Sequence, residues 1–136
     1  MPHFLDTNIL IYSISDNPEE AVKRDRAIAL LDQDRGALSV QVLQEFYVQA
    51  TRATRPGRLS HDIACGLIEA WCRFAVQDVT LAIVGDALAI RAQHGYSYWD
   101  SAILSAAGAL GCDVLYSEDM THGREIGGVT IVNPFR

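Results

Sequence analysis

The chain has 136 residues, 49% of them hydrophobic, which predicts one domain with a buried core and leaves no room for a second. Its 17 acidic and 11 basic side chains give a net charge of −6, which is unfavourable for binding nucleic acid by overall attraction. A single lysine, Lys23, excludes a P-loop, and three cysteines without a C-x-x-C pair argue against a disulfide framework and a zinc site. Residues 101–112, an uncharged stretch, fall short of the roughly 20 apolar residues of a membrane span. With no secretory leader visible before Asp6, we expect a cytoplasmic protein without membrane association.

Short apolar segments alternate with helical patterns along the chain. Strands are expected at 3–5, 37–39, 74–76, 114–116 and 129–132. Helices are expected at 7–14, 19–31, about 42–50, 60–72, 81–93 and 97–110, separated by turn signals such as Pro56-Gly57 and Gly95. This alternation predicts an α/β fold of three layers, α/β/α, with a central, mostly parallel sheet of four to five short strands. Ligands of such sheets bind just beyond the carboxyl ends of the strands.

Four carboxylates occupy positions that suit such a site. Asp6 directly follows the first strand, and Asp119 comes shortly after the strand at 114–116. Asp100 lies in the first turn of its helix on the face that turns inward, and Glu45 lies mid-helix beside the apolar stripe. If the first and fourth strands are neighbours, these four side chains can converge in one cleft.

A cluster of this kind has a definite chemistry. Two carboxylates about 5 Å apart repel by roughly 3 kcal/mol at an effective dielectric constant of 20. Three or four together either retain protons or recruit a divalent cation. Ligation by oxygen alone suits Mg²⁺ or Mn²⁺, and such a cation can activate water and stabilise the charge that develops when a phosphodiester is hydrolysed.

Each carboxylate also has a purely structural interpretation. Asp6 could cap the helix that begins at Thr7, and Ser97 with Asp100 matches a capping box. Glu45 could extend its head group to solvent from a half-buried helix. Asp119 lies in a loop, where aspartate is common as a turn residue.

Taken in order, these segments resemble the PIN-domain family, and within it the VapC-type toxins of prokaryotic toxin–antitoxin pairs. The resemblance spans essentially the whole chain and rests on residues 4–10 (FLDTNIL), 39–47 (SVQVLQEFY), 96–103 (YSYWDSAI), 111–120 (GCDVLYSEDM) and 129–135 (VTIVNPF). Asp-Thr-Asn alone is a weak signal, but four acidic segments in this order form a strong one.

The resemblance implies a single PIN-like nuclease domain, residues 1–136, that hydrolyses RNA with metal-activated water and leaves a 5′-phosphate and a 3′-hydroxyl. It assigns catalysis and metal binding, to Mg²⁺ or Mn²⁺, to Asp6, Glu45, Asp100 and Asp119. It gives supporting roles to Ser117 and to Asn8. It also implies a homodimer and a cognate antitoxin whose tail covers the cleft. The chain departs from the family pattern at residues 120–123, which lack the further aspartate that many relatives carry. This departure leaves the number of bound metal ions open.

Other residues could contact RNA. Four of the six net negative charges would be the site carboxylates, and bound cations would reverse the local field there. Arg52, Arg55 and Arg58 could contact an RNA backbone or form a solvated loop. Trp99, with two nearby tyrosines, could stack on unpaired bases, although its helical spacing beside Ile103 favours packing in the core.

Several alternatives use the same carboxylates. A phosphatase of the haloacid-dehalogenase kind requires Asp-x-Asp where this chain has Asp6-Thr7-Asn8, and a receiver domain requires a lysine near the last strands, far from Lys23. A DNA-directed nuclease and a catalytically silent PIN-like scaffold remain as alternatives. The presence of all four acids favours the ribonuclease.

Overall fold

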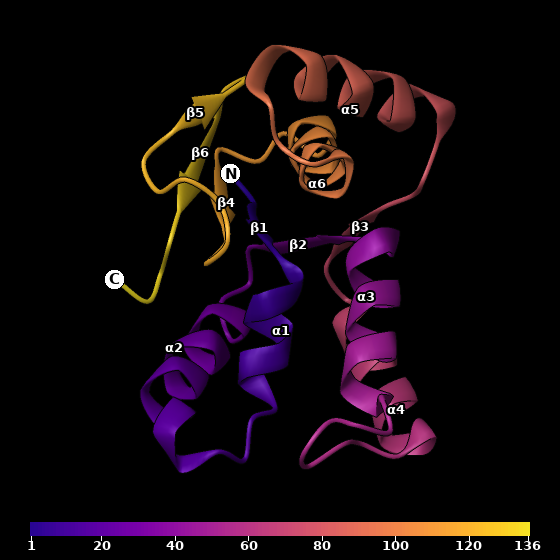
Figure 1. The fold of residues 1–136 in the computed structure, drawn as a ribbon, viewed down its shortest axis with the longest axis vertical. Helices are drawn as coiled ribbons and strands as arrows, with labels where there is room; N and C mark the ends of the chain where they lie inside the picture. Colours follow the sequence, from indigo (N-terminus) through magenta and orange to yellow (C-terminus); the bar gives the residue numbers. More distant parts are fainter.

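One twisted sheet forms the centre of the molecule (Figure 1), in a computed structural model that describes residues 1–136. Its strands are β1 (His3–Leu5), β2 (Gly36–Ser39), β3 (Ala75–Gln77), β4 (Val114–Tyr116), β5 (Glu125–Ile126) and β6 (Val129–Val132). They are ordered β3-β2-β1-β4-β6-β5, and all neighbouring pairs are parallel except β5 and β6. The two central strands, β1 and β4, are therefore adjacent although they lie far apart in the sequence.

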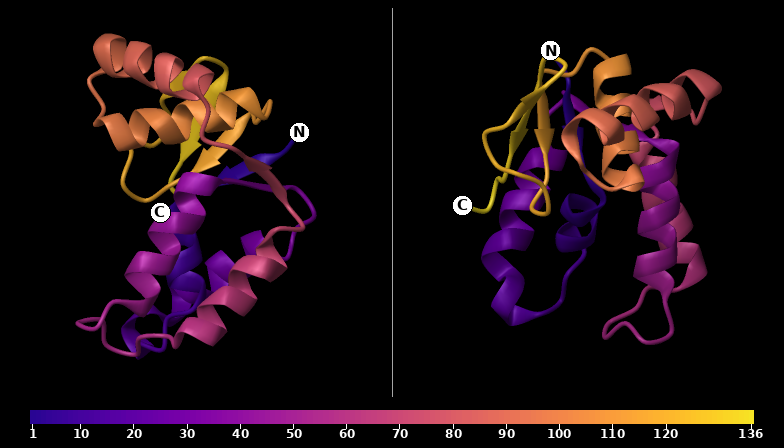
Figure 2. Two further views of the ribbon diagram at one scale, coloured as in Figure 1. Left: turned by 90° about the vertical axis from the view of Figure 1, so that its right-hand side faces the viewer. Right: turned by 45° about the horizontal axis from the view of Figure 1, so that its top comes forward.

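Helices cover the sheet on both sides. They are α1 (Thr7–Ser13), the 3₁₀ turn η1 (Pro18–Glu20), α2 (Ala21–Leu31), α3 (Val40–Thr51), α4 (His61–Trp71), α5 (Leu81–His94) and α6 (Tyr98–Ala109). The pair α5 and α6 lies on one side of the sheet and α1 to α4 on the other, and the further views show the same separation (Figures 1 and 2). Not one of these helices has the length and apolar character that a bilayer crossing demands.

The helix starts are set by local side-chain caps. Ser39, Ser60, Thr80 and Ser97 each accept a hydrogen bond from the backbone N–H three residues later, which satisfies a donor that the helix itself leaves free. Gly95 ends α5 with a φ of 76°, a left-handed conformation that glycine adopts without steric cost. These signals are local, which is why the helix positions were predictable.

The core lies between the layers and includes 25 buried hydrophobic residues. Phe4 of β1 and Leu115 of β4 are fully buried and are direct partners in the β1–β4 register. Leu5 and Tyr116 form the next pair of this register. This register places Asp6 and Ser117, the residues that directly follow β1 and β4, at the same edge of the sheet. The topology thus positions the candidate site.

The predicted fold class is confirmed, with one difference in strand number. The sheet has six strands rather than four to five, because β5 was not predicted. This strand has only two residues, one of them the exposed Glu125, so it carries no hydrophobic pattern, and it forms only by antiparallel pairing with β6.

Candidate functional site

Asp6 lies at the centre of the candidate site, at the carboxyl end of β1. Its side chain is 95% buried, and it caps α1 by accepting a hydrogen bond of 2.7 Å at Oδ1 from the backbone N–H of Thr7. At Oδ2 it accepts a second bond of 2.7 Å from the hydroxyl of Ser117, which follows β4. The capping interpretation and the site interpretation are therefore compatible, because the same carboxylate does both.

Glu45 reaches the site from the middle of α3. Its Oε1 accepts a hydrogen bond of 2.6 Å from the hydroxyl of Thr7, and its Oε2 a longer one of 3.4 Å from the amide of Gln41. These contacts direct the carboxylate inward rather than to solvent. Thr7 and Gln41 were not among the predicted site residues. The spacing of Gln41 and Glu45, one helical turn apart on α3, was the available signal.

The remaining two carboxylates come from α6 and from the loop after β4. Asp100 lies in the first turn of α6, where its backbone N–H donates to the hydroxyl of Ser97. Asp119 accepts a hydrogen bond of 3.1 Å at Oδ2 from the amide of Asn8, whose own oxygen accepts from the backbone N–H of Glu118. Asn8 therefore joins the start of α1 to the loop that carries Asp119.

These carboxylates line one cleft of about 350 Å³. All four predicted acids contribute to it, together with the acidic side chains of Glu20 and Glu118, whereas no lysine, arginine or histidine lines it. Its other lining residues include Thr7, Asn8, Tyr12, Gln41 and Gln49. We call it the acid cleft. The fold thus brings the four predicted acids together from four separated segments of the chain.

The electrostatics of the cleft reflect this crowding. Burial raises the pKa of Asp6 to about 7, and the carboxylates of Asp100 and Glu45 act in the same direction, while hydrogen bonds from Ser117 and Thr7 oppose the rise. Burial also raises the pKa of Asp100, reinforced by Asp119 and Glu45. The charged forms of these groups are thus disfavoured unless a cation compensates them.

The residues fit a hard divalent cation in their chemistry. Their donor atoms are carboxylate oxygens, the ligands that Mg²⁺ and Mn²⁺ prefer, and no basic side chain lines the cleft to compensate their charge. In this conformation no three His, Cys, Asp or Glu side chains come close enough to hold a metal ion by themselves. A cation would therefore need to draw the carboxylates together or retain water ligands.

A second polar group borders the acid cleft. The ammonium of Lys23 forms a salt bridge of 2.7 Å with Glu118, and the hydroxyl of Tyr12 donates to the same carboxylate. Burial acts to raise the pKa of Glu118, but the hydrogen bonds from Lys23 and Tyr12 outweigh it, so this pKa is lowered. Although Lys23 comes early in the sequence, the fold places it beside the strand ends. There it pairs with Glu118 and not with Asp6.

The predicted RNA-contacting residues lie at different distances from the acid cleft and differ in exposure. Arg52 lines a groove next to the acid cleft, whereas Arg55 and Arg58 line neither the cleft nor that groove. The expectation that Trp99 packs in the core is wrong, since 63% of its surface is exposed. Burial along α6 begins only at Ser101, so helical spacing within the first turn did not indicate burial.

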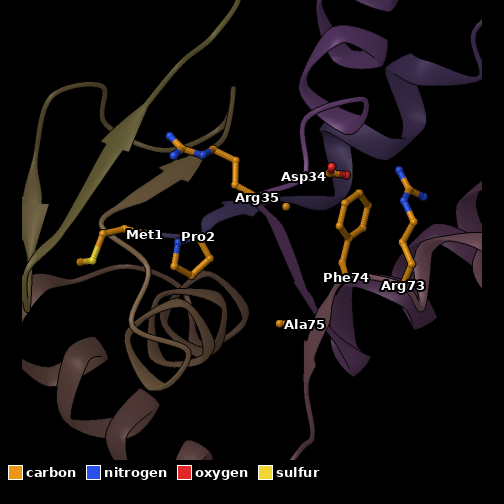
Figure 3. A pocket seen from close by; sticks show the side chains of 8 residues that line it. Met1, Pro2, Asp34, Arg35, Arg73, Phe74 and Ala75 are labelled. Atoms are coloured by element: carbon orange, nitrogen blue, oxygen red, sulfur yellow. The ribbon is translucent and has the colours of Figure 1, made fainter.

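A larger hollow of about 470 Å³ lies at the other end of the sheet (Figure 3). It is lined by residues that precede or begin β1, β2 and β3: Met1, Pro2, Asp34, Arg35, Gly36, Arg73, Phe74 and Ala75. None of the predicted site residues contributes to it. The acid cleft, at the carboxyl ends of the strands, is where ligands bind in open α/β sheets.

The structure is an α/β fold whose central sheet carries an acid cleft at the carboxyl ends of its central strands. The PIN domain family model matches residues 3–124, and the chain belongs to this family. Among curated proteins, no sequence gives a significant match.

Solved structures with this fold include toxin–antitoxin proteins. A toxin–antitoxin complex from Klebsiella pneumoniae superposes with a TM-score of 0.72 at 22% identity, covering 97% of each chain. VapC20 of Mycobacterium tuberculosis, described as a sarcin–ricin loop cleaving toxin, gives 0.67 at 17% identity over 86% of this chain and 89% of its own. VapBC2 of Rickettsia felis, bound to a DNA fragment from its promoter, gives 0.65 at 19% identity over 96% and 97%. The likeness at these identities is one of fold.

Proposed function

We propose that this protein is a divalent-metal-dependent endoribonuclease and the toxin of a toxin–antitoxin pair. The observation that carries the proposal is the acid cleft, in which four separated segments deliver Asp6, Glu45, Asp100 and Asp119 to one place without a basic side chain among them. A buried carboxylate whose pKa is raised to about 7 is costly to keep unless a cation uses it. Membership of the PIN domain family is consistent with this use.

In this proposal the four carboxylates hold Mg²⁺ or Mn²⁺. A cation bound there would activate a water for attack and would offset the charge that develops on the phosphate during hydrolysis. The residues around the carboxylates orient them: Ser117 and the N–H of Thr7 hold Asp6, and the Thr7 hydroxyl holds Glu45. Asn8 holds Asp119 in the same way. Such orientation of metal ligands by hydrogen bonds commonly contributes about 10- to 100-fold in activity or metal affinity.

The choice of RNA as substrate and of an antitoxin as partner rests on similarity of fold. VapC20 is described as cleaving the sarcin–ricin loop, and the Klebsiella pneumoniae and Rickettsia felis structures are complexes of toxin with antitoxin. By analogy we propose a cytoplasmic protein that binds a cognate antitoxin over the acid cleft and forms a homodimer. The acid cleft, which six acidic side chains and no basic one line, would attract a basic segment of such a partner.

Two alternatives use the same fold. A DNA-directed nuclease would use the same carboxylates, and a silent binding module would need none of them. The retention of all four acids, each held by a hydrogen bond or a helix start, favours an enzyme over a silent module.

The test is RNA cleavage by the purified chain, free of any antitoxin, with Mg²⁺ or Mn²⁺ in one arm and chelator in the other. We expect cleavage only with cation, and its loss in Asp6→Asn and in Asp100→Asn with the fold intact by circular dichroism. Asp86→Asn is the matched control, because Asp86 is an exposed acid of α5 outside the acid cleft. Unchanged turnover by Asp100→Asn would disprove the site. Cutting of single-stranded DNA but not RNA would favour the DNA-directed alternative.

A further inference from the structure

Trp99 is the most conspicuous exposed aromatic residue of the molecule. It lies in the first turn of α6, immediately before Asp100, with 63% of its surface exposed. Its position is nevertheless well defined. Its ring packs edge-to-face against Tyr98 with ring centroids 5.1 Å apart, and its backbone carbonyl accepts a hydrogen bond of 3.1 Å from the amide of Gln41. An indole that is fixed by its neighbours yet exposed is available for contact with a molecule outside the protein core.

Trp99 lines a groove of about 340 Å³, which we call the Trp99 groove. Its lining residues are Gln41, Gln44, Glu45, Val48, Gln49, Arg52 and Trp99. Three of them, Gln41, Glu45 and Gln49, also line the acid cleft, so the two depressions are continuous. Arg52 is the only basic residue that lines either one. The groove therefore combines a flat aromatic ring, a cation and three side-chain amides next to the carboxylates.

We propose that the Trp99 groove binds one unpaired base of the RNA substrate beside the phosphate that is cut in the acid cleft. This inference rests on the proposed function. Trp99 stacks on the base, and Arg52 contacts an adjacent phosphate. The side-chain amides of Gln44 and Gln49 offer donors and acceptors to the edge of the base. Because the bases of a duplex are already stacked and paired, the groove selects a single-stranded segment, loop or bulge.

The composition of the groove favours a nucleotide over a second protein chain. Only Val48 and Trp99 are large apolar residues there, whereas the centre of a protein interface is depleted of carboxylates and would not suit Glu45. A protein partner is better matched to a second groove that Trp99 also lines, which includes Val79, Ile83 and Tyr98.

The sequence offers a direct probe, because the only other tryptophan is buried. Trp71 is 95% buried and packs edge-to-face on Phe46, so Trp71→Phe leaves Trp99 as the only source of tryptophan fluorescence. In the full chain carrying Trp71→Phe, with Asp6→Asn to prevent cleavage, a mixed-sequence single-stranded 12-mer RNA is titrated in Mg²⁺. The same sequence as a blunt duplex is titrated in parallel. We expect quenching of Trp99 and protection from acrylamide with the single strand and little change with the duplex.

Affinity is measured by anisotropy of labelled RNA. Trp99→Ala should weaken binding of the single strand roughly tenfold, from the usual contribution of one base–aromatic stack, and Trp99→Phe should restore most of it. Leu81→Ala is the control, since Leu81 is exposed and lines neither depression. Equal affinity of Trp99→Ala and the parent, or equal quenching by duplex and single strand, would overturn the inference.

Two further readouts separate this inference from its alternatives. If Trp99→Ala changes the oligomeric state in sedimentation velocity while RNA affinity is unchanged, Trp99 belongs to a protein interface and the inference fails. RNA cleavage is also measured for the protein that retains Asp6, with Trp99 and with Trp99→Ala. Cation-dependent cleavage at equal rates with and without the Trp99 ring would overturn the stacking role and leave the proposed function standing. A parent that neither binds nor cuts RNA overturns both.

Discussion

The hydroxyl of Ser117 donates a hydrogen bond of 2.7 Å to Oδ2 of Asp6, and this contact joins residues that lie 111 positions apart. Ser117 is fully buried, and its oxygen also accepts from the backbone N–H of Asp119 at 3.2 Å. One hydroxyl therefore links the carboxylate of Asp6 to the backbone of Asp119, another acidic residue of the acid cleft. It exists as a contact only because β1 and β4 are neighbours in register.

Ser117→Ala should lower nuclease activity by about 10- to 100-fold, because Asp6 loses the bond that orients it. The buried Oδ2 of Asp6 then lacks a hydrogen-bond donor, so the free energy of unfolding should fall by about 1 to 3 kcal/mol. Ser105→Ala is the control, since the buried Ser105 hydroxyl bonds to the carbonyl of Ile83 away from the cleft. The control should lose stability without losing activity. Equal activity losses in the two variants would contradict an orienting role for Ser117.

Asp6→Asn should stabilise the metal-free protein at pH 8. Burial raises the pKa of Asp6 from 3.8 to about 7, so between these values the folded state binds a proton that the unfolded state has released. The contribution of this group to stability therefore rises as the pH falls from about 7 toward 3.8. Asn removes the buried charge, and we expect a gain of about 1 to 3 kcal/mol at pH 8 that is smaller at pH 5. Urea unfolding in chelator measures it; an equal or larger gain at pH 5 would refute the assignment.

Thr7→Val should reduce activity by roughly tenfold, because the nearly isosteric side chain keeps the packing but cannot donate to Glu45. Thr7→Ser retains the hydroxyl and should restore most of the activity. The backbone N–H of Thr7, which donates to Asp6, is unaffected by either change. Steady-state cleavage of one RNA by the three proteins is the measurement, and identical rates for Val and Thr would exclude this role.

Adding Mg²⁺ or Mn²⁺ should stabilise the unmutated protein, since a ligand that binds only the folded state adds about 2.7 kcal/mol at 100 times its Kd. Thermal unfolding followed with increasing cation should show a rising Tm, and chelator should reverse it. Asp119→Asn should need more cation for the same rise, whereas Asp86→Asn should behave as the parent does. A Tm that is insensitive to both cations would argue against metal binding in the acid cleft.

The sequence by itself determined the local structure and the residue types of the site. Ser39, Ser60, Thr80 and Ser97 mark helix starts through bonds that reach only three residues, and apolar segments mark all strands except β5. The position of Asp6 after a strand followed from the same local pattern. So did the α/β class, because short apolar strands that alternate with helices require a sheet covered on both faces.

Only the tertiary structure decided which of these residues meet. Thr7 contacts Glu45 across 38 positions and Lys23 reaches Glu118 across 95, and neither contact has a sequence spacing that predicts it. The exposure of Trp99 depends likewise on where the first turn of α6 lies against the other layers, not on its helical spacing. Hydrophobic periodicity and capping act over one or two helical turns. Contacts between distant segments depend on strand order and register, which the packing of the whole core selects.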